Sequence, residues 1–452
     1  MRVLLIQPPL EDFYTTAIRL YPLGLTYAAA VLRRLGVAVG ILDCLNPLKK
    51  HPLPLPPDFG HLKPFFQQDP FLFKRYYRFG ISEAAVVRAI EKFAPDLIGI
   101  SSQFSAYFSS VARLAAVIKA HADVPVFIGG NHASVFADKI RQRAPHIDAV
   151  LPGPAESSLP AFIHSRCNGW IPNPEPVDWK TLEPAHDLLP AGAYRMGRKS
   201  YVSLSAGRGC PYGCDFCSVR AMFGRGIEYR PVDAVIREME WNYLNRGVRI
   251  FNFEDDNLSF DRQWFRQLLE SVIDHPVLKE IELTAMNGIC FPTLDGPLLM
   301  LMRRAGFQRL NLSFVTRDAG LQQRYHRPAP RDDFGAIIAD ARRLGFMITV
   351  YVIIGLPGQT FAEIRESIDY LLDLGVLVGP SPFYLPPGSA LFDTLKVPDS
   401  VRENWNLYRA TAFAVETEQL CREQLIELFS YTRRRNLEKR KALGLEKTGC
   451  GI

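Results

Sequence analysis

Short apolar runs alternate with segments of helical periodicity over the first 166 residues. Mainly apolar runs of strand length predict strands at 2–7, 37–42, 96–101, 124–128 and 148–151. Apolar residues recur at helical spacing over 23–35, where Gly36 is the expected end of the helix, and again over 111–122. Strands separated by such helices predict a doubly wound parallel sheet, which binds ligands at the carboxyl ends of its strands.

A second alternation follows a proline-rich stretch at 167–199, which has no apolar period and is expected to be a linker. Strands are predicted at 201–205, 248–253, 280–285, 309–314, 347–354 and 377–384. The helices predicted between them are 232–245, 261–273, 297–305, 332–344 and 361–374. Strands with crossover helices in this order predict a partial (βα)6 barrel, with its chemistry at the carboxyl ends of the strands. Helical spacing over 401–415 and 418–443 then predicts a helical C-terminal region.

The length of the chain, 452 residues, exceeds the usual size of one hydrophobic core, so several domains are expected. The patterns divide it into 1–166, the linker, 200–395 and 396–452. Residues 46–80 interrupt the first domain with a stretch rich in proline and aromatic residues. Because disordered segments are poor in aromatic residues, we expect an ordered segment, either a flap over a ligand or an aromatic patch between domains.

The composition narrows the class of protein. An apolar fraction of 48% is typical of a folded globular protein, and a net charge of +6 is too small for a dedicated nucleic-acid binder. No apolar run reaches the ~18 residues of a transmembrane helix, and the apolar start is too short for a signal peptide. Eight cysteines, three of them clustered, indicate a reducing compartment, so we expect a cytoplasmic protein.

The three clustered cysteines lie in Gly209-Cys210-Pro211-Tyr212-Gly213-Cys214-Asp215-Phe216-Cys217, directly after a predicted strand. Thiolates at this spacing can close around one metal centre, and soft sulfur selects iron–sulfur clusters, zinc or copper. Zinc usually takes a further ligand from a second Cys or His pair, and no such pair follows. Three cysteines without a partner fit a [4Fe–4S] cluster with one open iron; zinc and unrelated buried thiols are the alternatives.

The spacing Cys-x-x-x-Cys-x-x-Cys, with an aromatic residue before its last cysteine, resembles the motif of the radical S-adenosylmethionine (SAM) superfamily. The resemblance implies that Cys210, Cys214 and Cys217 ligate the cluster and that Phe216 lies beside the adenine of SAM. In that family SAM chelates the open iron and is cleaved to methionine and a 5′-deoxyadenosyl radical, which takes hydrogen from the substrate. The family also implies an external electron donor of the flavodoxin or ferredoxin kind.

Acidic residues follow the second predicted barrel strand, in Phe253-Glu254-Asp255-Asp256-Asn257. The resemblance implies that Glu254 or Asp255 meets the ammonium group of SAM. The other interpretation of these acids is a helix N-cap with favourable charges at the helix dipole.

Two later strands carry further residues that the resemblance assigns to SAM. Asn311 and Ser313 lie on the fourth barrel strand, and Gly355 and Pro357 follow the fifth. Where the family usually has a glutamate after this fifth strand, the chain has Gln359.

The loops of the first domain resemble the cobalamin-binding domain that precedes many radical SAM cores. The resemblance rests on Tyr21-Pro22-Leu23-Gly24-Leu25, Gly129-Gly130-Asn131-His132-Ala133-Ser134 and the loop at Gly153. The cobalamin-binding residues that it implies are Ser101, Ser102, Gly129, Gly130, Asn131, His132, Gly153 and Glu156.

Two features depart from the cobalamin pattern. Gly153-Pro154-Ala155-Glu156 stands where the family has Gly-Glu-Gly-Glu, and the chain has no Asp-x-His-x-x-Gly motif. Cobalamin is therefore expected to bind without an axial histidine from that motif. We expect His132 to pack or to hydrogen-bond rather than to ligate cobalt.

The predicted fold is thus α/β, with a doubly wound Rossmann-like cobalamin-binding domain, a partial (βα)6 radical SAM barrel and a C-terminal helical region. The resemblance implies a cobalamin-dependent methyltransferase that modifies a carbon of a small-molecule or natural-product substrate through methylcobalamin and a 5′-deoxyadenosyl radical. A cyclisation or rearrangement without net methyl transfer is the alternative, and product mass separates the two. A non-catalytic iron–sulfur protein would need neither the barrel nor the acidic motif. The expected cofactors are a [4Fe–4S] cluster, SAM and cobalamin, with no nucleic-acid partner and no membrane span.

Overall fold

The computed structural model describes residues 1–14, 21–68, 71–73, 75–166, 177–287, 289–328 and 334–442. The chain forms two compact units, of which unit 1 comprises residues 1–56 and 75–194 and unit 2 comprises residues 57–74 and 195–452. Residues 167–176 of the predicted linker lie outside the described residues. In the described part of the chain, no helix has both the length and the apolar character needed to cross a membrane.

Unit 1 is built on a five-stranded parallel sheet with the order β3-β1-β6-β7-β8. In chain order these strands run 2-1-3-4-5, so the winding direction reverses between β1 and β6, and doubly wound sheets bind ligands at such a reversal. The predicted doubly wound sheet is confirmed. Its strands are β1 (Arg2–Gln7), β3 (Ala38–Asp43), β6 (Leu97–Ser101), β7 (Val126–Gly129) and β8 (Ala149–Leu151).

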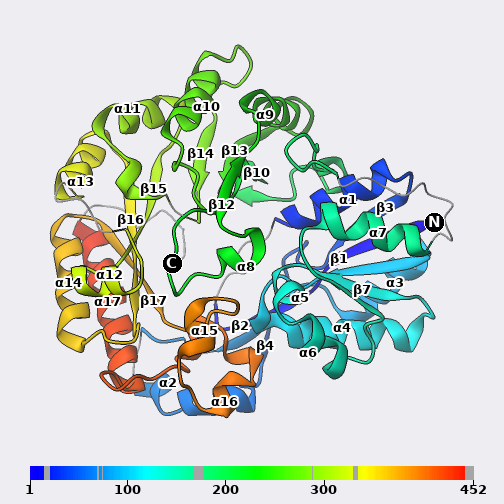
Figure 1. Cartoon of the computed structure of the whole chain (residues 1–452), viewed down its shortest axis with the longest axis horizontal. Coiled ribbons are helices and arrows are strands. Elements are labelled where there is room, and N and C mark those ends of the chain that lie inside the picture. The colour runs from blue at the N-terminus through cyan, green and yellow to red at the C-terminus, as the bar shows by residue number, and fades with distance from the viewer. Residues whose placement is uncertain are drawn as a thin grey trace. The chain divides into compact units, whose positions relative to one another are not determined.

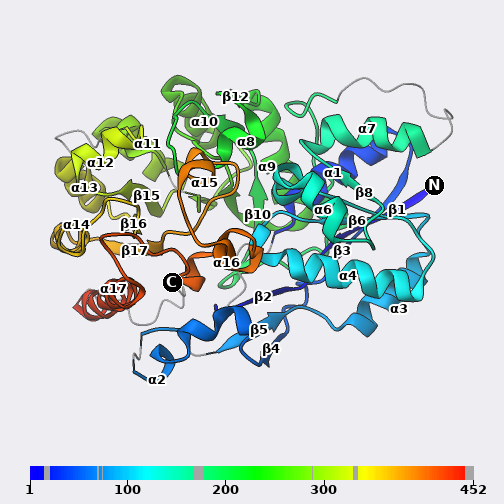
Figure 2. The ribbon, with the colours of Figure 1, turned by 60° about the horizontal axis from the view of Figure 1, so that its bottom comes forward.

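Helices cover both faces of this sheet, with α1 and α7 on one face and α3 and α4 on the other (Figure 2). The main core of unit 1 lies under α1 and α7, where their apolar residues meet those of the strands. Helix α1 ends as predicted, because Gly36 adopts a φ of +71° that favours glycine. The helices are α1 (Leu23–Arg34), α3 (Glu83–Phe93), α4 (Phe108–His121), α5 (Asn131–Val135), α6 (Ala137–Arg143) and α7 (Ala155–Arg166).

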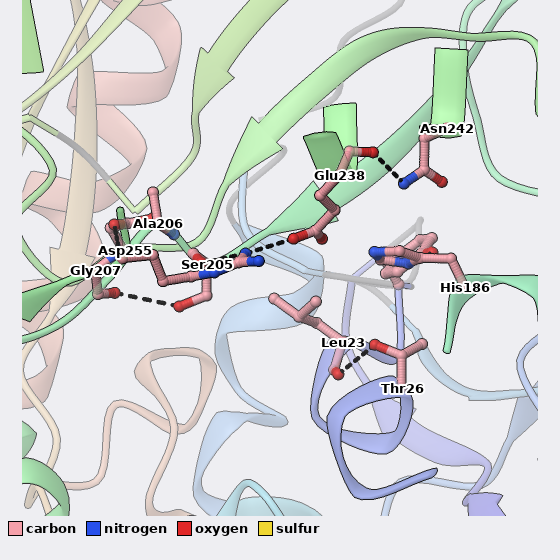
Figure 3. Close-up of polar contacts among 11 residues, drawn as sticks. Leu23, Thr26, His186, Ser205, Ala206, Gly207, Glu238, Asn242 and Asp255 are labelled. Atoms are coloured by element: carbon pink, nitrogen blue, oxygen red, sulfur yellow. Dashed lines mark hydrogen bonds and ion pairs between the residues drawn. The ribbon is translucent and has the colours of Figure 1, made fainter. Parts of the chain in front are cut away.

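Residues 177–194, which were predicted as part of the linker, pack on α1 within unit 1. The backbone N–H of Ala185 donates to the carbonyl oxygen of Thr26 (3.0 Å). His186 is buried, and its Nδ1 lies 2.5 Å from the hydroxyl of Tyr21. Figure 3 shows His186 beside the first turn of α1. These contacts make the segment part of the folded unit rather than a free connection.

In its described part, unit 2 contains six parallel strands that follow one another in chain order, with helices on the outside (Figure 1). Strands β10, β13 and β14 pair in one run and β15, β16 and β17 in another, and parallel bridges at Leu283–Phe307 and Ile289–Leu312 join the two. The predicted partial barrel is confirmed. The strands are β10 (Lys199–Leu204), β13 (Val248–Phe253), β14 (Glu282–Ala285), β15 (Arg309–Val315), β16 (Met347–Ile354) and β17 (Leu377–Pro382). The outer helices are α9 (Val232–Arg246), α10 (Arg262–Asp274), α11 (Gly296–Ala305), α13 (Phe334–Arg343) and α14 (Phe361–Asp373).

The region after the barrel is helical in part only. The helix predicted over 418–443 is α17 (Arg422–Ala442), but the one predicted over 401–415 is wrong. That stretch holds the end of α16 (Asp399–Arg402) and two short 3-10 turns. The amides of Asn404 and Asn406 both donate to the Asp58 carboxylate (2.9 and 2.8 Å), and these tertiary contacts replace a continuous helix. The apolar spacing there reflects burial in an irregular segment.

The proline- and aromatic-rich insertion at 46–80 is ordered in its described part, as expected. Its ends form strands β4 (Lys50–Leu53) and β5 (Tyr76–Phe79), which pair with β2 (Leu10–Asp12) in unit 1. Its middle belongs to unit 2, where Phe59 is fully buried and the ring of Phe73 lies 5.4 Å from that of Phe429 in α17. The insertion is therefore anchored on the C-terminal segment of unit 2, and a role as a flap stays a prediction.

Replacing Asn436 with alanine is expected to destabilise unit 2 by about 3 kcal/mol. Asn436 on α17 accepts from the N–H of Val378 (3.0 Å) and donates to its carbonyl oxygen (2.6 Å) at the outer edge of β17. Val378 is fully buried, and each polar group left without a partner costs about 1–3 kcal/mol. Chemical denaturation measures the change, with exposed Asn245→Ala on α9 as the control. An unchanged unfolding midpoint would contradict the edge-capping role.

Candidate cofactor sites

The three clustered cysteines lie on and after a two-stranded hairpin in unit 2. Strand β11 (Gly207–Cys210) pairs antiparallel with β12 (Gly226–Tyr229), and Cys210 is the last residue of β11. Cys214 is buried, and its carbonyl oxygen accepts from the N–H of Cys217 (3.0 Å) in a tight turn. Gly209 has a φ of +88°, and a Cβ there would lie 2.5 Å from a backbone oxygen of β12, so only glycine fits. The hairpin thus presents the cysteines in a fixed loop.

Asp255, at the carboxyl end of β13, holds the start of this hairpin. It is buried, and its two carboxyl oxygens accept from the backbone N–H groups of Ala206 (3.1 Å) and Gly207. Figure 3 shows the three residues together. Burial raises the pKa of Asp255 to about 8, against the opposing effect of these hydrogen bonds. Both oxygens are therefore engaged in positioning the chain that leads to Cys210.

A buried ion pair also holds residues 205 and 206, which lead into the hairpin. Arg230 and Glu238 are both almost fully buried and bonded to each other. Arg230 also donates through Nη1 to the carbonyl oxygen of Ser205 (3.3 Å), and its backbone N–H donates to Ala206 (2.8 Å). Asn242 donates to the carbonyl oxygen of Glu238 (2.9 Å), as Figure 3 shows. Because a buried charge without its partner is costly, this pair fixes where the hairpin leaves the barrel.

The next two residues of the acidic motif contact the hairpin nearer to the cysteines. The Asp256 carboxylate accepts from the backbone N–H of Gly209 (2.9 Å). The Asn257 amide donates through Nδ2 to the Sγ of Cys210 (3.6 Å). Residues 255–257 therefore form hydrogen bonds along β11, from Gly207 to Cys210.

Cys214 is contacted by Arg327, which lies beyond β15 in the chain. The Nη1 of Arg327 lies 3.9 Å from the Sγ of Cys214, and Nη2 donates to the carbonyl oxygen of Ser313 (2.7 Å). Burial raises the pKa of Cys214, and the positive charge of Arg327 opposes that rise. The guanidinium therefore links the cysteine loop to β15 and favours a thiolate at Cys214.

These three thiols have the chemistry that a [4Fe–4S] cluster needs. Among the described residues, no three His, Cys, Asp or Glu side chains are grouped as ligands of one ion. A [4Fe–4S] cluster takes a separate thiolate at each iron, so its ligands need not converge on one point. Burial raises the pKa of Cys217 to about 11, so thiolate formation there must be coupled to iron binding, with release of a proton.

Glu254, the other acid expected near SAM, is half-buried and directly follows β13. Its Oε1 accepts from the Nδ2 of Asn252 (2.6 Å) and from the hydroxyl of Ser203 (3.3 Å). Its carbonyl oxygen accepts from the Nδ2 of Asn287 (2.8 Å). Residues of neighbouring barrel strands thus orient this carboxylate at their carboxyl ends.

Phe216 and Pro357, which the sequence assigns to SAM, are connected through Tyr325. The rings of Phe216 and Tyr325 meet edge to face with centroids 6.2 Å apart. The hydroxyl of Tyr325 donates to the carbonyl oxygen of Pro357 (2.5 Å), and its carbonyl oxygen accepts from the N–H of Asp215 (3.2 Å). The structure thus brings the cysteine loop and the turn after β16 to one tyrosine.

Two more barrel residues assigned to SAM, and the nearby Gln359, which was not assigned, contact other parts of unit 2. Asn311 donates to the carbonyl oxygen of Ala285 on the neighbouring strand (3.1 Å). Gly355 has a φ of +91° and lies against Leu425 of α17, which leaves no room for a side chain. Gln359 is buried, and its Oε1 accepts from the N–H of Leu356 (2.8 Å), which closes its own turn.

In unit 1, Ser102 and Gly130 form a close backbone contact just beyond β6 and β7. The N–H of Ser102 donates to the carbonyl oxygen of Gly129 (2.8 Å), and a Cβ at Gly130 would lie 2.8 Å from the carbonyl oxygen of Ser102. Gly130 has a φ of +113°. The buried hydroxyl of Ser102 has no hydrogen-bond partner within the described ranges. A polar ligand at this strand edge would supply one, so these residues fit a cobalamin site.

His132 packs within unit 1, as expected. Its ring is almost fully buried, 4.7 Å from the ring of Phe108 and 5.2 Å from that of Phe136. Its Nδ1 lies 2.8 Å from the hydroxyl of Ser105. Burial lowers the pKa of His132 to about 3, so the imidazole is neutral at physiological pH.

The other residues assigned to cobalamin lie around the same strand ends. Ser101 ends β6, and Asn131 is exposed at the start of α5. The Gly153 N–H donates to the hydroxyl of Ser134 (2.9 Å), which in turn donates to the carbonyl oxygen of Gly130 and so ties the two loops together. Glu156 is buried in the first turn of α7.

Replacing Gly130 with alanine is expected to lower the affinity for cobalamin about tenfold and to leave the iron content unchanged. The added methyl group would meet the backbone of Ser102 at a φ that L-residues rarely adopt, a strain of about 1–3 kcal/mol. The cobalt bound per chain after anaerobic reconstitution measures the effect. Gly192→Ala is the matched control, because this glycine of unit 1 also has a positive φ (+72°) but nothing lies within 4 Å of a Cβ there. A full cobalt content in Gly130→Ala would contradict the proposal that this loop binds cobalamin.

Some of these contacts could not be predicted from the sequence. Asn257 belongs to the acidic motif that the sequence analysis identified, so a position near the cysteine loop could have been predicted for it. The sequence predicts a charged loop after the fourth barrel strand, but the short helix α12 (Ala319–Arg324) lies there, directly before Tyr325 and Arg327. Nothing in the sequence of this segment indicated a contact with Cys214 or Phe216.

Family models match both halves of the chain. Residues 74–163 match the B12 binding domain, and residues 204–371 match the radical SAM superfamily. The first match covers most of residues 75–194, the longer of the two segments that make up unit 1. The second begins at the end of β10 and includes all three clustered cysteines.

Two relatives and one solved structure are similar to the chain over two thirds or more of its length. The chain is 26% identical to cytidylyl-2-hydroxyethylphosphonate methyltransferase of Streptomyces wedmorensis, over 83% of this chain and 77% of that protein. It is 24% identical to bacteriochlorophyllide d C-12(1)-methyltransferase of Chlorobaculum tepidum, over 67% of each chain. Its fold is similar to that of the radical SAM methyltransferase TsrM of Kitasatospora setae with cobalamin and a [4Fe–4S] cluster bound (TM-score 0.65, 15% identity, 98% of this chain and 99% of that one).

The two matched domains define the cofactors of the protein. A radical SAM domain implies a [4Fe–4S] cluster and SAM, and a B12 binding domain implies cobalamin. Both sites described above fit these groups on the chemistry of their own residues. The chain is therefore a radical SAM enzyme whose radical SAM domain is preceded by a B12-binding domain.

Proposed function

We propose that this enzyme is a cobalamin-dependent methyltransferase that adds a methyl group to a carbon of a small-molecule substrate. The observation that carries the proposal is the clamped cysteine hairpin, which offers three thiols at the carboxyl ends of the barrel strands. The similarity to two methyltransferases over two thirds or more of this chain supports the choice of reaction.

In this proposal Cys210, Cys214 and Cys217 hold the cluster, and Glu254 holds the ammonium group of SAM. Glu254 is preferred to Asp255 because both oxygens of Asp255 already accept hydrogen bonds from the hairpin backbone. The proposed SAM contacts of the other barrel residues are those of Phe216, Asn311, Ser313, Gly355 and Pro357.

Cobalamin is assigned to the strand ends of unit 1. There Ser102 offers a hydroxyl and Gly130 lets the backbone approach a ligand closely. The proposed cobalamin site further includes Ser101, Gly129, Asn131, His132, Gly153 and Glu156. His132 acts through packing and through Ser105, because its neutral ring is enclosed by two phenylalanines.

When bound, the cluster and SAM supply radical chemistry and cobalamin supplies methyl transfer. The chain's own residues position these groups. The hairpin and Asp255 fix the thiolates, and Asn252 and Ser203 orient Glu254.

The setting of the enzyme is part of the same proposal. An external flavodoxin- or ferredoxin-like protein is the proposed source of electrons, and no nucleic acid is involved. A cytoplasmic location suits the free cysteines of the described chain. The proposed domain boundaries are 1–166, 200–395 and 396–452, joined by residues 167–199, of which 177–194 fold onto unit 1.

The test begins with the metal content of protein purified anaerobically after growth with cobalamin. The proposal expects about four irons and one cobalt per chain. Candidate small molecules are then incubated with SAM and a reductant, and a product heavier by one methyl group is sought by mass spectrometry.

Each outcome decides between named alternatives. Zinc in place of iron would overturn the cluster assignment. Iron without cobalt would make unit 1 a binding module for another ligand. A product formed without an added carbon would replace methyl transfer with a cyclisation or rearrangement.

A further inference from the structure

The sulfur of each clustered cysteine accepts a hydrogen bond from an N–H group of another residue. The Nδ2 of Asn257 lies 3.6 Å from the Sγ of Cys210, and the Nη1 of Arg327 lies 3.9 Å from the Sγ of Cys214. For Cys217 the donor is the backbone N–H of Val219, which lowers the pKa of that thiol against the effect of burial. Only the first two donors are side chains, so only these can be removed by substitution.

Asn257 is rigidly placed for this contact. It is buried, and its carbonyl oxygen accepts from the hydroxyl of Tyr229 (2.7 Å). The Tyr229 ring stacks on Trp264 with centroids 4.4 Å apart, and the Trp264 indole donates to the carbonyl oxygen of Arg230 (2.8 Å). A metal-bound thiolate can only accept, so the amide must present its Nδ2 to Cys210.

Arg327 is equally constrained. Its Nη2 donates to the carbonyl oxygen of Ser313 on β15 (2.7 Å), and its backbone N–H donates to the carbonyl oxygen of Gln322 (2.8 Å). The half-buried guanidinium is therefore held with Nη1 toward Cys214. Unlike the amide of Asn257, it also brings a full positive charge.

Hydrogen bonds to the sulfurs of a cluster change its reduction potential. Reduction adds negative charge to the cluster and its thiolates. An N–H group that points at a sulfur stabilises the reduced form more than the oxidised form, and a nearby cation does the same. Both donors should therefore raise the potential and make the cluster easier to reduce.

We propose that Asn257 and Arg327 are positioning residues that set the reduction potential of the cluster through N–H···S hydrogen bonds to Cys210 and Cys214. The inference rests on the proposed function, in which these cysteines are the cluster ligands. It goes further by giving two residues outside the cysteine motif a defined electronic effect.

The experiment uses the full chain, reconstituted anaerobically with iron and sulfide, as wild type, Asn257→Leu and Arg327→Met. Iron per chain is measured first, and the potential is then measured by a redox titration followed by electron paramagnetic resonance. At a fixed solution potential, each variant should hold about two- to tenfold less reduced cluster, since one hydrogen bond to sulfur is lost. Arg303→Met is the matched control, because its guanidinium donates to Phe307 and Gln308 instead.

The outcomes separate this inference from the function beneath it. A wild type that binds no iron would overturn the proposed function. Variants with full iron and an unchanged potential would overturn the inference and leave the function standing.

Variants that lose iron are replaced by conservative ones that retain most of the side-chain volume. Asn257→Asp removes the donor and adds negative charge, so it should lower the potential further than Asn257→Leu. Arg327→Lys keeps the charge and should restore part of the loss seen in Arg327→Met. A potential equal to that of the wild type in Asn257→Asp would also overturn the inference.

Discussion

Alanine at any one of Cys210, Cys214 or Cys217 is expected to remove the iron–sulfur cluster and to abolish the cleavage of SAM. The proposed site has three protein ligands, so each substitution deletes one of only three attachments. Loss of a residue that merely orients a metal ligand costs about 10–100-fold in metal affinity or activity, and loss of the ligand itself should exceed that range. The iron content should fall from about four per chain to near zero.

Cobalt content is the internal control for these variants. The proposed cobalamin residues lie on the sheet of unit 1, which has its own core, so the variants should retain about one cobalt per chain. Cys421→Ala is the matched substitution, because Cys421 is an exposed free cysteine. A single variant that kept full iron would remove that cysteine from the ligand set. Iron loss in Cys421→Ala would mean that the assay reports general damage.

Strand positions were predictable from the sequence because buried parallel strands are short, nearly continuous apolar runs. The run at 347–354 coincides with β16, and the run at 2–7 coincides with β1. Helical spacing misled at 401–415, where the apolar residues are buried in an irregular segment whose Asn404 and Asn406 side chains bond to Asp58. Periodicity indicates which residues are buried. It does not indicate that a carboxylate far away in the sequence, here that of Asp58, binds side chains of the segment.

The candidate site was predictable where it depends on spacing and not where it depends on tertiary contacts. Cys210, Cys214 and Cys217 are local in sequence and do lie in one loop. The acidic motif was found, but its sequence could not tell which carboxylate bonds to the backbone of a hairpin some fifty residues earlier. Arg327 was missed for the same reason, since its contact with Cys214 is formed only when β15 takes its place in the barrel.

Exchanging each acid for its amide should show whether Glu254 or Asp255 binds the ammonium group of SAM. Glu254→Gln is expected to weaken SAM binding about 10- to 100-fold with iron unchanged, because a charge-assisted bond to the ammonium group is lost. Asp255→Asn is expected to lower the iron content. An amide can accept through only one of its two terminal atoms, so either Ala206 or Gly207 would lose its partner.

Anaerobic equilibrium dialysis with labelled SAM, alongside iron analysis, measures both effects on the same samples. Glu270→Gln is the control, because this exposed glutamate on α10 pairs only loosely with Arg266 (4.0 Å). The reverse pattern, with SAM binding lost in Asp255→Asn at full iron and kept in Glu254→Gln, would transfer the SAM role to Asp255. That result would require the Asp255 carboxylate to leave two backbone N–H groups in a buried setting, at about 1–3 kcal/mol for each. The proposal therefore keeps Glu254 as the SAM carboxylate and Asp255, bonded to the backbone of Ala206 and Gly207, as the residue that holds the cysteine hairpin.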